Sequence, residues 1–228
     1  MIMASIPILV LRLEGVLQSW GEHSKWDHRD SAPMPTKSGI IGLLGCALGL
    51  ERNDPKLQSM AQQLKLAVRA DKQGVEMSDF HTVRSRHLLN AAGKHRGKIG
   101  EYSTLVTNRI YLQDAYFTVA IAGERDMLEK IADALQRPKW PIYLGRKSCV
   151  PSRPVFDGII EAYSSLEEAI CAIDEFAEGT VLVELEDSAE EGLLRVERQD
   201  VNVGGRRFRS RLVLRKIMER RKTEDVSE

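Results

Sequence analysis

The segment from Ser38 to Leu50, SGIIGLLGCALGL, constrains the fold more than any other part of the chain. Its apolar residues lie nearly all the way round a helix, which predicts a helix buried on most of its sides. Gly49 and the charged run ERNDP predict where this helix ends. Each internal glycine lowers helix stability by roughly 1 kcal/mol relative to alanine, so we expect these small residues to allow close packing. At 228 residues and 43% hydrophobic content, the chain can supply the core that such a helix needs.

Strands and helices alternate around this segment. Up to about residue 150 we expect a strand at 5–13, the helix at 38–50, a helix at 55–64, a strand at 65–70 with a hairpin partner at 75–83, an exposed excursion at 84–109, a strand at 110–122, a helix at 126–135 and an extended segment at 141–144 that leads into a turn at Gly145. This order predicts an α+β fold, a ferredoxin-like or RNA-recognition-type (RRM-like) sandwich, over residues 1–150. Residues 151–228 are expected to form a small β-rich C-terminal subdomain with a helix at 166–175, strands at 180–185, 193–199 and 207–217, and a tight turn at 204–205.

The charges of the chain are segregated, although the 33 basic and 33 acidic residues cancel. The windows 81–110, 137–153 and 206–222 contain 20 of the 33 Lys and Arg residues and only 2 of the 33 acids. The segment 157–191 contains twelve carboxylates and no Lys or Arg. Such segregation predicts a polarised surface, with charges scattered for solubility as the alternative.

The motif PMPTKSG at 33–39 precedes the buried helix. A nucleotide-phosphate loop needs glycines before its lysine, and prolines stand there instead, which excludes an ATPase or kinase of that type. Lys37 and Ser38 lie where the amides and dipole of a helix N-terminus favour an anion such as an RNA phosphate. The alternative is that Ser38 only caps the helix.

Two further basic segments are candidates for contact with a nucleic acid. In YLGRKS, an aromatic side chain, a glycine turn and two cations place Tyr143 beside Arg146 and Lys147, which suits base stacking next to phosphates. The alternative there is a buried tyrosine with two surface charges. The alternation RFRSR predicts Arg207, Arg209 and Arg211 on one strand face, as a phosphate track or a subunit contact.

The ordered motifs of the chain resemble those of one protein family. The run LRLEGVLQSWG at 11–21, then Arg29-Asp30, PMPTKSGIIGLLGCALGLERND at 33–54, DFHTV at 79–83, DAYFTVA at 114–120 and YLGRKSC at 143–149 are similar to the CasD family, the Cas-five group of RAMP proteins in type I-E CRISPR Cascade. The likeness spans about two thirds of the chain.

The resemblance implies a ferredoxin-like RAMP domain with an inserted basic thumb at about 84–109. It also implies a non-catalytic RNA-binding subunit that holds the 5′ handle of the crRNA in antiviral defence. The implied partners are the crRNA, the backbone subunit CasC, the large subunit CasA and, indirectly through the complex, target DNA. The side chains expected to meet phosphates or bases in the thumb are His81, Arg84, Arg86, Lys94, Arg96, Lys98, Tyr102 and Arg109. A solvated basic loop is the competing interpretation.

An enzyme remains the alternative function, because type I-C relatives process CRISPR RNA. Metal-independent cleavage of repeat RNA needs a general base and a cation or acid, and His81, His87, His95 and Tyr102 are suitable types. No catalytic residue, metal site or cofactor is assigned, since no carboxylate cluster or His/Cys spacing suggests one. Three distant cysteines, no CxxC pair and no long apolar run favour a cytoplasmic protein without a membrane segment.

Overall fold

The computed structural model describes residues 5–23, 27–89, 93–95, 97–98, 100–173, 179–186, 195–202 and 207–220. The strands are β1 (Ile8–Glu14), β2 (Leu17–Gln18), β3 (His28–Arg29), β4 (Lys65–Lys72), β5 (Val75–Ser85), β6 (Ser103–Gln113), β7 (Tyr116–Ala122), β8 (Phe156–Ile160), β9 (Gly179–Glu186), β10 (Arg195–Asn202) and β11 (Phe208–Arg220). The helices are α1 (Lys37–Leu48), α2 (Pro55–Gln63), α3 (Arg125–Gln136) and α4 (Leu166–Ala172).

A seven-stranded sheet forms the body of the molecule, with the strand order β10-β11-β9-β4-β7-β1-β8. Every pairing in this sheet is antiparallel. Strand β1 lies between β7 and β8, and its first six residues, ILVLRL, are buried. The prediction of a central strand at 5–13 is confirmed.

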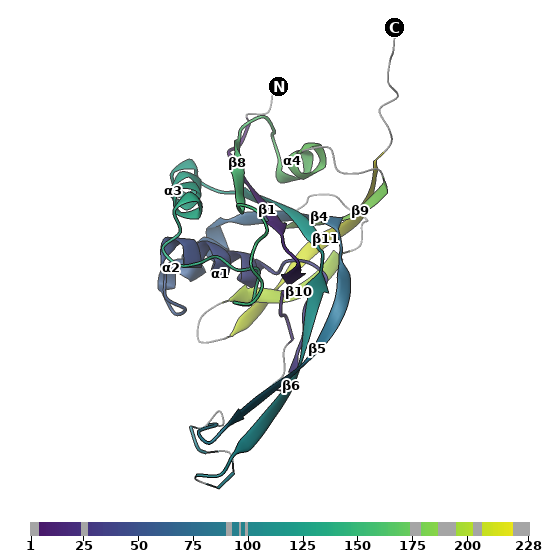
Figure 1. The fold of residues 1–228 in the computed structure, drawn as a ribbon. Helices are drawn as coiled ribbons and strands as arrows, with labels where there is room; N and C mark the ends of the chain where they lie inside the picture. Colours follow the sequence, from purple (N-terminus) through teal and green to yellow (C-terminus); the bar gives the residue numbers. More distant parts are fainter. Residues whose placement is uncertain are drawn as a thin grey trace.

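Alternate residues of β1 contribute to two hydrophobic cores on opposite faces of the sheet. Leu9, Leu11 and Leu13 pack with apolar residues of α1, α2 and α3. Ile8 and Val10 pack with Ala169 and Ile170 of α4 and with the inner strands. Figure 1 shows α1, α2 and α3 on one side of the sheet and α4 on the other. The larger core therefore lies under the three N-terminal helices.

Helix α1 confirms the buried helix expected from the sequence. Thr36, not Ser38, caps its N-terminus by accepting a hydrogen bond from the Gly39 amide, and Gly49 ends it at φ 71°. Small residues do allow close packing: a Cβ on Gly39 would lie 2.7 Å from Trp20, and one on Gly45 would lie 2.4 Å from Leu57.

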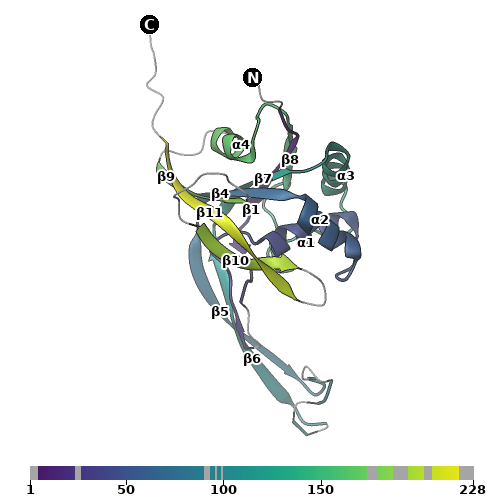
Figure 2. The ribbon, with the colours of Figure 1, turned by 180° about the vertical axis from the view of Figure 1, so that it is seen from behind.

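Strands β5 and β6 form a long antiparallel hairpin that extends away from the body (Figure 1 and, from behind, Figure 2). Its register pairs Val75 with Gln113 at the base and Ser85 with Ser103 near the tip. The short strands β2 and β3 pair with β6 close to the body. About a third of the expected excursion at 84–109 is therefore strand, because β5 reaches Ser85 and β6 begins at Ser103.

Two strand predictions are wrong. We expected β5 to be the hairpin partner of β4, but β4 pairs with β7 and β9, and β5 pairs with β6. We also expected one strand at 110–122. The chain turns at Asp114, where φ is 53°, so that β6 and β7 belong to different sheets.

The C-terminal strands continue the main sheet. Strand β9 pairs with β4 at Ala67 to Ala70, and β11 joins β9 to β10. Backbone hydrogen bonds thus run across the expected boundary near residue 150, and the division into 1–150 and 151–228 stays a prediction. The expected turn at 204–205 lies outside the described residues.

Candidate nucleic-acid interface

The outer part of hairpin β5–β6 carries a cluster of two arginines on one tyrosine. The guanidinium carbons of Arg84 and Arg86 lie 4.8 Å and 4.6 Å from the centre of the Tyr102 ring. Tyr102 is 56% exposed, and both arginines are exposed. The register explains the contact: Arg84 faces Thr104, and continuing that alternation brings Arg86 opposite Tyr102. We call these three residues the Tyr102 cluster.

The same face of the hairpin carries exposed apolar side chains that the sequence analysis did not single out. Phe80 is 68% exposed and Val106 is 40% exposed. Phe80 lies an even number of residues from Arg84, and Val106 pairs with Thr82 between them, so all are on one face. In the sequence DFHTVRSR, the even spacing of Phe80 from Arg84 and Arg86 was the signal available for placing Phe80 on their face. Phe80 and Val106 thus form an apolar strip in the middle of the hairpin, on the same face as the Tyr102 cluster.

His81 and Arg109 lie on the opposite face of the hairpin. His81 pairs with Thr107, and Arg109 pairs with Asp79. Arg109 is half-buried and its Nε donates a hydrogen bond to Thr107 Oγ1 at 3.2 Å. The hairpin backbone therefore separates His81 from Tyr102, and these two groups cannot serve one reaction as an acid and base pair.

The tip of the hairpin holds the remaining predicted thumb residues. Lys94 and Lys98 are exposed, and Arg96 lies outside the described residues. The rings of His87 and His95 lie 6.0 Å apart at an interplanar angle of 59°. Cations and aromatic rings therefore concentrate at the tip and outer part of the hairpin.

Lys37 is not available to RNA, which corrects the expectation from the PMPTKSG motif. Its side chain is 3% exposed, and its Nζ donates to Glu186 Oε1 at 2.6 Å and to the Leu64 carbonyl at 3.0 Å. Its backbone amide donates to Asp200 Oδ2 at 2.7 Å. The carboxylate of Asp200 thus takes the place at the start of α1 that we expected a phosphate to occupy. Ser38 is half-buried, and its Oγ lies 3.4 Å from Thr36 Oγ1.

Asp200 belongs to a charge network between α1 and the C-terminal strands. Arg211 donates to both Asp200 carboxylate oxygens, at 2.7 Å and 2.9 Å. The network holds equal numbers of cations and carboxylates, namely Lys37, Arg198, Arg211 and Arg215 with Glu22, Glu184, Glu186 and Asp200. Buried charges of this kind need such pairing, and here it fastens β9, β10 and β11 to α1.

Burial and charge in the network shift the pKa values of Asp200 and Lys37. Burial alone would raise the pKa of Asp200, but the hydrogen bonds and charge of Arg211, together with the Lys37 amide, hold it below the ordinary value. Burial lowers the pKa of Lys37, and the nearby Glu186 carboxylate opposes that change. Asp200 is therefore ionised at neutral pH and acts as an internal anion.

The turn after Tyr143 is built around Arg146. The Arg146 guanidinium donates to the carbonyls of Ile110, Arg29 and Asp30 at 3.0 Å, 2.9 Å and 3.1 Å, and lies 4.6 Å from the centre of the Tyr111 ring. We expected Arg146 to meet phosphates, but its donors are engaged by the protein itself. Tyr143 is half-buried, and Lys147 is exposed.

The three C-terminal arginines separate into two groups. Arg207 and Arg209 are exposed. Arg211 is 10% exposed and paired with Asp200, so it is not available to the phosphate track that we expected from the three arginines. The described geometry thus brings together Arg84, Arg86 and Tyr102, and it engages Lys37, Arg146 and Arg211 in contacts within the protein.

Comparison with known proteins relates this geometry to one family. The profile of the family described as CRISPR-associated protein (Cas_Cas5) matches residues 8–219, which includes both sheets and the hairpin. The chain belongs to the Cas5 family. The CRISPR system Cascade subunit CasD of Escherichia coli (strain K12) is 35% identical over 166 residues, which are 68% of this chain and 71% of that protein.

Solved structures are similar to this Cas5 chain over most of its length. A subunit of a structure described as "CRISPR RNA-guided surveillance complex" has 32% identity and a TM-score of 0.69, over 93% of this chain and 89% of that one. A second, described as "Crystal structure of Cas protein", has 37% identity and a TM-score of 0.67, over 93% and 95% of the two chains. The mixed α/β architecture and the resemblance noted in the sequence are confirmed.

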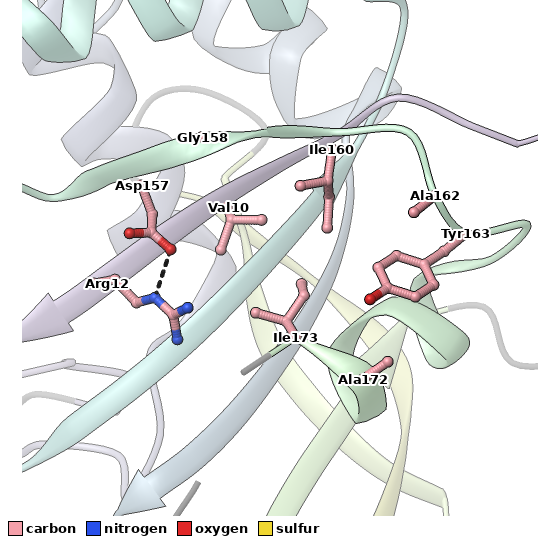
Figure 3. A pocket seen from close by; sticks show the side chains of 9 residues that line it. All are labelled: Val10, Arg12, Asp157, Gly158, Ile160, Ala162, Tyr163, Ala172 and Ile173. Atoms are coloured by element: carbon pink, nitrogen blue, oxygen red, sulfur yellow. Dashed lines mark hydrogen bonds and ion pairs between the residues drawn. The ribbon is translucent and has the colours of Figure 1, made fainter. Parts of the chain in front are cut away.

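The body of the Cas5 chain also contains a cavity of about 220 Å³ between β1, β8 and α4. Figure 3 shows Arg12 and Asp157 at one end of it and Tyr163 at the other. Arg12 Nε donates to Asp157 at 2.9 Å, and its NH1 donates to Thr118 Oγ1 at 2.7 Å. The charged groups at this cavity are thus paired with each other.

Two further observations concern the described residues alone. They contain no group of three or more His, Cys, Asp or Glu residues placed to hold a metal ion. None of their helices combines the length and the apolar character that crossing a membrane requires.

Proposed function

We propose that this protein is the crRNA 5′-handle-binding subunit of a type I-E Cascade and that hairpin β5–β6 is its RNA-gripping thumb. The observation that carries the proposal is the Tyr102 cluster, in which two cations and one exposed ring meet at the outer part of a projecting hairpin. Single-stranded RNA is bound by this combination, because rings stack on unpaired bases and cations meet phosphates. Contacts with the subunits CasC and CasA, with target DNA reached indirectly, belong to the same proposal, as does a cytoplasmic location.

The Tyr102 cluster is suited to exchange partners when RNA arrives. An exposed cation–π contact is worth about 0.5–1 kcal/mol, whereas a hydrogen bond between charged groups is worth about 1.5–3 kcal/mol. Arg84 or Arg86 can therefore leave the ring for a phosphate, and the freed ring face can accept a base. The apolar strip of Phe80 and Val106 extends the surface over which unpaired bases can lie.

The order of the inner strands supports a ferredoxin-like RAMP core. Strands β4, β7, β1 and β8 are neighbours in this order and antiparallel throughout, with α1 and α3 on one face. This is the arrangement of a β-α-β-β-α-β unit in which the first and third strands are central. The thumb then enters between the second and third strands of that unit.

The remaining surface candidates fall into two sets. Lys94 and Lys98 with Arg207 and Arg209 are exposed cations that suit contact with handle phosphates, and Lys147 is an exposed cation on the body. His81 and Arg109 lie on the opposite face of the hairpin, and Tyr143 lies in the turn before Gly145. These three residues suit contacts to bases or to a neighbouring subunit. Arg96 stays a prediction from the sequence alone.

A binding role without catalysis suits this arrangement better than RNA cleavage. Of the four acid and base candidates, His81 and Tyr102 are on opposite faces of the hairpin, as the register of β5 and β6 requires, whereas the rings of His87 and His95 lie 6.0 Å apart at the tip. Cleavage of CRISPR repeat RNA, as in type I-C relatives, needs both groups near one phosphate.

The salt dependence of RNA binding tests the proposal. Replacing Arg84 and Arg86 by alanine removes two expected phosphate contacts, so the slope of log K against log salt for handle RNA should fall by about 1.4. Tyr102→Ala should weaken binding by about 1–3 kcal/mol, and Tyr102→Phe should restore most of it. Lys130→Ala, an exposed lysine of α3, is the charge control. An unchanged slope in the double variant would refute the proposed contacts.

Incubation with repeat RNA separates the two functions. The wild-type protein should leave the RNA intact after prolonged incubation without metal. Cleavage that disappears in His81→Ala would establish the enzyme instead. Tagged protein should also bring down a crRNA with an intact 5′ end together with other Cascade subunits.

A further inference from the structure

We infer that a second nucleic-acid-binding surface lies on the body of the protein, around the last turn of α1, and that it binds a segment of single-stranded nucleic acid. The surface consists of Arg137, Lys139, Trp140 and Lys147, and we call it the Trp140 patch. Trp140 is 39% exposed, and the three cations are exposed as well. Figure 1 shows α1 and α3 on the body, away from the tip of hairpin β5–β6, so the patch is separate from the Tyr102 cluster.

Backbone contacts hold the segment 137–141 against the end of α1. The Lys139 amide donates to the Ala47 carbonyl at 2.9 Å, and Cys46 Sγ donates to the Pro141 carbonyl at 3.2 Å. The aliphatic part of Lys139 crosses Gly49, where an added Cβ would lie 2.1 Å from Lys139 Cδ. The patch is therefore fixed on the helix and does not depend on the hairpin.

Lys147 comes from the Tyr143 turn, six residues after Pro141 in the chain. Burial raises the pKa of the Cys46 thiol, and the charge of Lys147 acts on that thiol in the opposite direction. Cys46 in turn contacts Pro141, next to Trp140. Arg146, held by three carbonyls, fixes the turn that presents Lys147.

The cations of the patch are not held in ion pairs. Within the part of the chain that the structure describes, Arg137, Lys139 and Lys147 form no ion pair with a carboxylate. The sequence between Asp133 and Asp157 contains no acid, and the first acids after α1 are Glu51, which is exposed, and Asp54, which caps α2. Unpaired cations beside an exposed indole favour single-stranded nucleic acid as the partner, because it offers phosphates and accessible base faces, over another protein.

Tryptophan fluorescence reports this contact directly. Trp20 is 1% exposed, and Trp26→Phe removes the only other indole, so emission changes then come from Trp140. The full-length protein should also carry Arg84→Ala, Arg86→Ala and Tyr102→Ala, which keeps the hairpin from contributing. Titration with the oligonucleotides dT12 and rU12 should quench the emission, because a base stacks on the indole.

Substitutions then measure the contributions to binding. Trp140→Ala should weaken binding of the oligonucleotides by about 5-fold to 100-fold, as expected for loss of one stacked base. Lys139→Ala with Lys147→Ala should lower the salt slope by about 1.4, at 0.7 for each lost contact to a single strand. Lys130→Ala, elsewhere on α3, should leave affinity and slope unchanged.

Each outcome decides for or against the inference. Equal quenching by dT12 and rU12 supports a surface that contacts phosphates and base faces without distinguishing DNA from RNA. Quenching by one of them alone assigns the bound strand to DNA or to RNA. Absence of quenching, an unchanged salt slope, or equal weakening in Lys130→Ala overturns the inference. Unchanged oligonucleotide binding with loss of co-purifying Cascade subunits in Trp140→Ala also overturns it and assigns the patch to a protein neighbour. Failure of hairpin binding would not affect these results, since the hairpin is already substituted.

Discussion

Replacing Asp200 by alanine tests whether the charge network fastens the C-terminal strands to α1. Asp200 is 1% exposed and accepts hydrogen bonds from the Lys37 amide at 2.7 Å and from Arg211 at 2.7 Å and 2.9 Å. Hydrogen bonds to a charged group contribute about 1.5–3 kcal/mol each, but the desolvation of Asp200 offsets part of that sum. Removing one partner of a buried pair costs about 3–5 kcal/mol, because the other charge stays buried.

We therefore expect Asp200→Ala to lower the free energy of unfolding in urea by about 3–5 kcal/mol. For a chain of this size each kcal/mol changes Tm by about 2–4 °C, so Tm should fall by about 6–20 °C. Asp133→Ala, at an exposed position of α3, is the matched control and should change the free energy by less than about 0.5 kcal/mol. Adding Arg211→Met to Asp200→Ala should recover part of the lost unfolding free energy, since it removes the cation that would stay buried without its carboxylate. A loss below about 1 kcal/mol in Asp200→Ala would refute this account of the network.

The same residue predicts a direction of pH dependence. The pKa of Asp200 is lowered in the folded protein, so the folded state binds its proton less readily than the unfolded state does. The stability from Asp200 is then fully present above the ordinary carboxyl pKa of 3.8 and is lost as pH falls through the lower, folded-state pKa. The difference in unfolding free energy between wild type and Asp200→Asn should accordingly be constant from pH 5 to 8 and shrink below about pH 4.

Three other substitutions test local assignments. Gly145→Ala should destabilise the protein by more than about 2 kcal/mol, seen as a lower Tm, because φ is 89° and the new Cβ would lie 1.7 Å from the Ser19 carbonyl oxygen. Arg146→Gln should lower Tm while leaving the salt slope of handle-RNA binding unchanged, and a slope reduced by about 0.7 would instead show a phosphate contact. Thr36→Ala should cost about 1 kcal/mol in urea unfolding and Ser38→Ala clearly less, since Thr36 is the cap; the reverse order would contradict this.

Local patterns predicted the elements well where one periodicity dominates. The run IIGLLGCAL predicted α1 because it is apolar on every side, and ILVLRL predicted β1 because both of its faces are buried. The prediction of a strand at 75–83 covered most of β5, whereas the outer part of β6 fell within the predicted excursion at 84–109. Exposed and half-buried residues alternate in the outer part of β6, but its two apolar residues, Leu105 and Val106, are adjacent, so no alternation of apolar residues marks a strand there.

Pairings between distant residues were not predictable from local patterns. Lys37 pairs with Glu186, and Arg211 pairs with Asp200 where a phosphate was expected, because the partner carboxylates reach α1 only through the sheet order. The pairing of β4 with β9 rather than β5 has the same origin. Five consecutive buried residues in β4 are typical of an inner strand, whereas β5 is an edge strand of the hairpin sheet.

The pairing of β4 with β9 also governs when the sheet can be completed during synthesis. At 5–20 residues per second, the roughly one hundred residues between the end of β4 and the start of β9 take roughly 5 to 20 s to translate. Throughout that interval one edge of β4 has no native partner, and unpaired strand edges of this kind invite aggregation. The nascent chain therefore needs its C-terminal strands, or a chaperone in their place, to cover an edge that the N-terminal half alone leaves open.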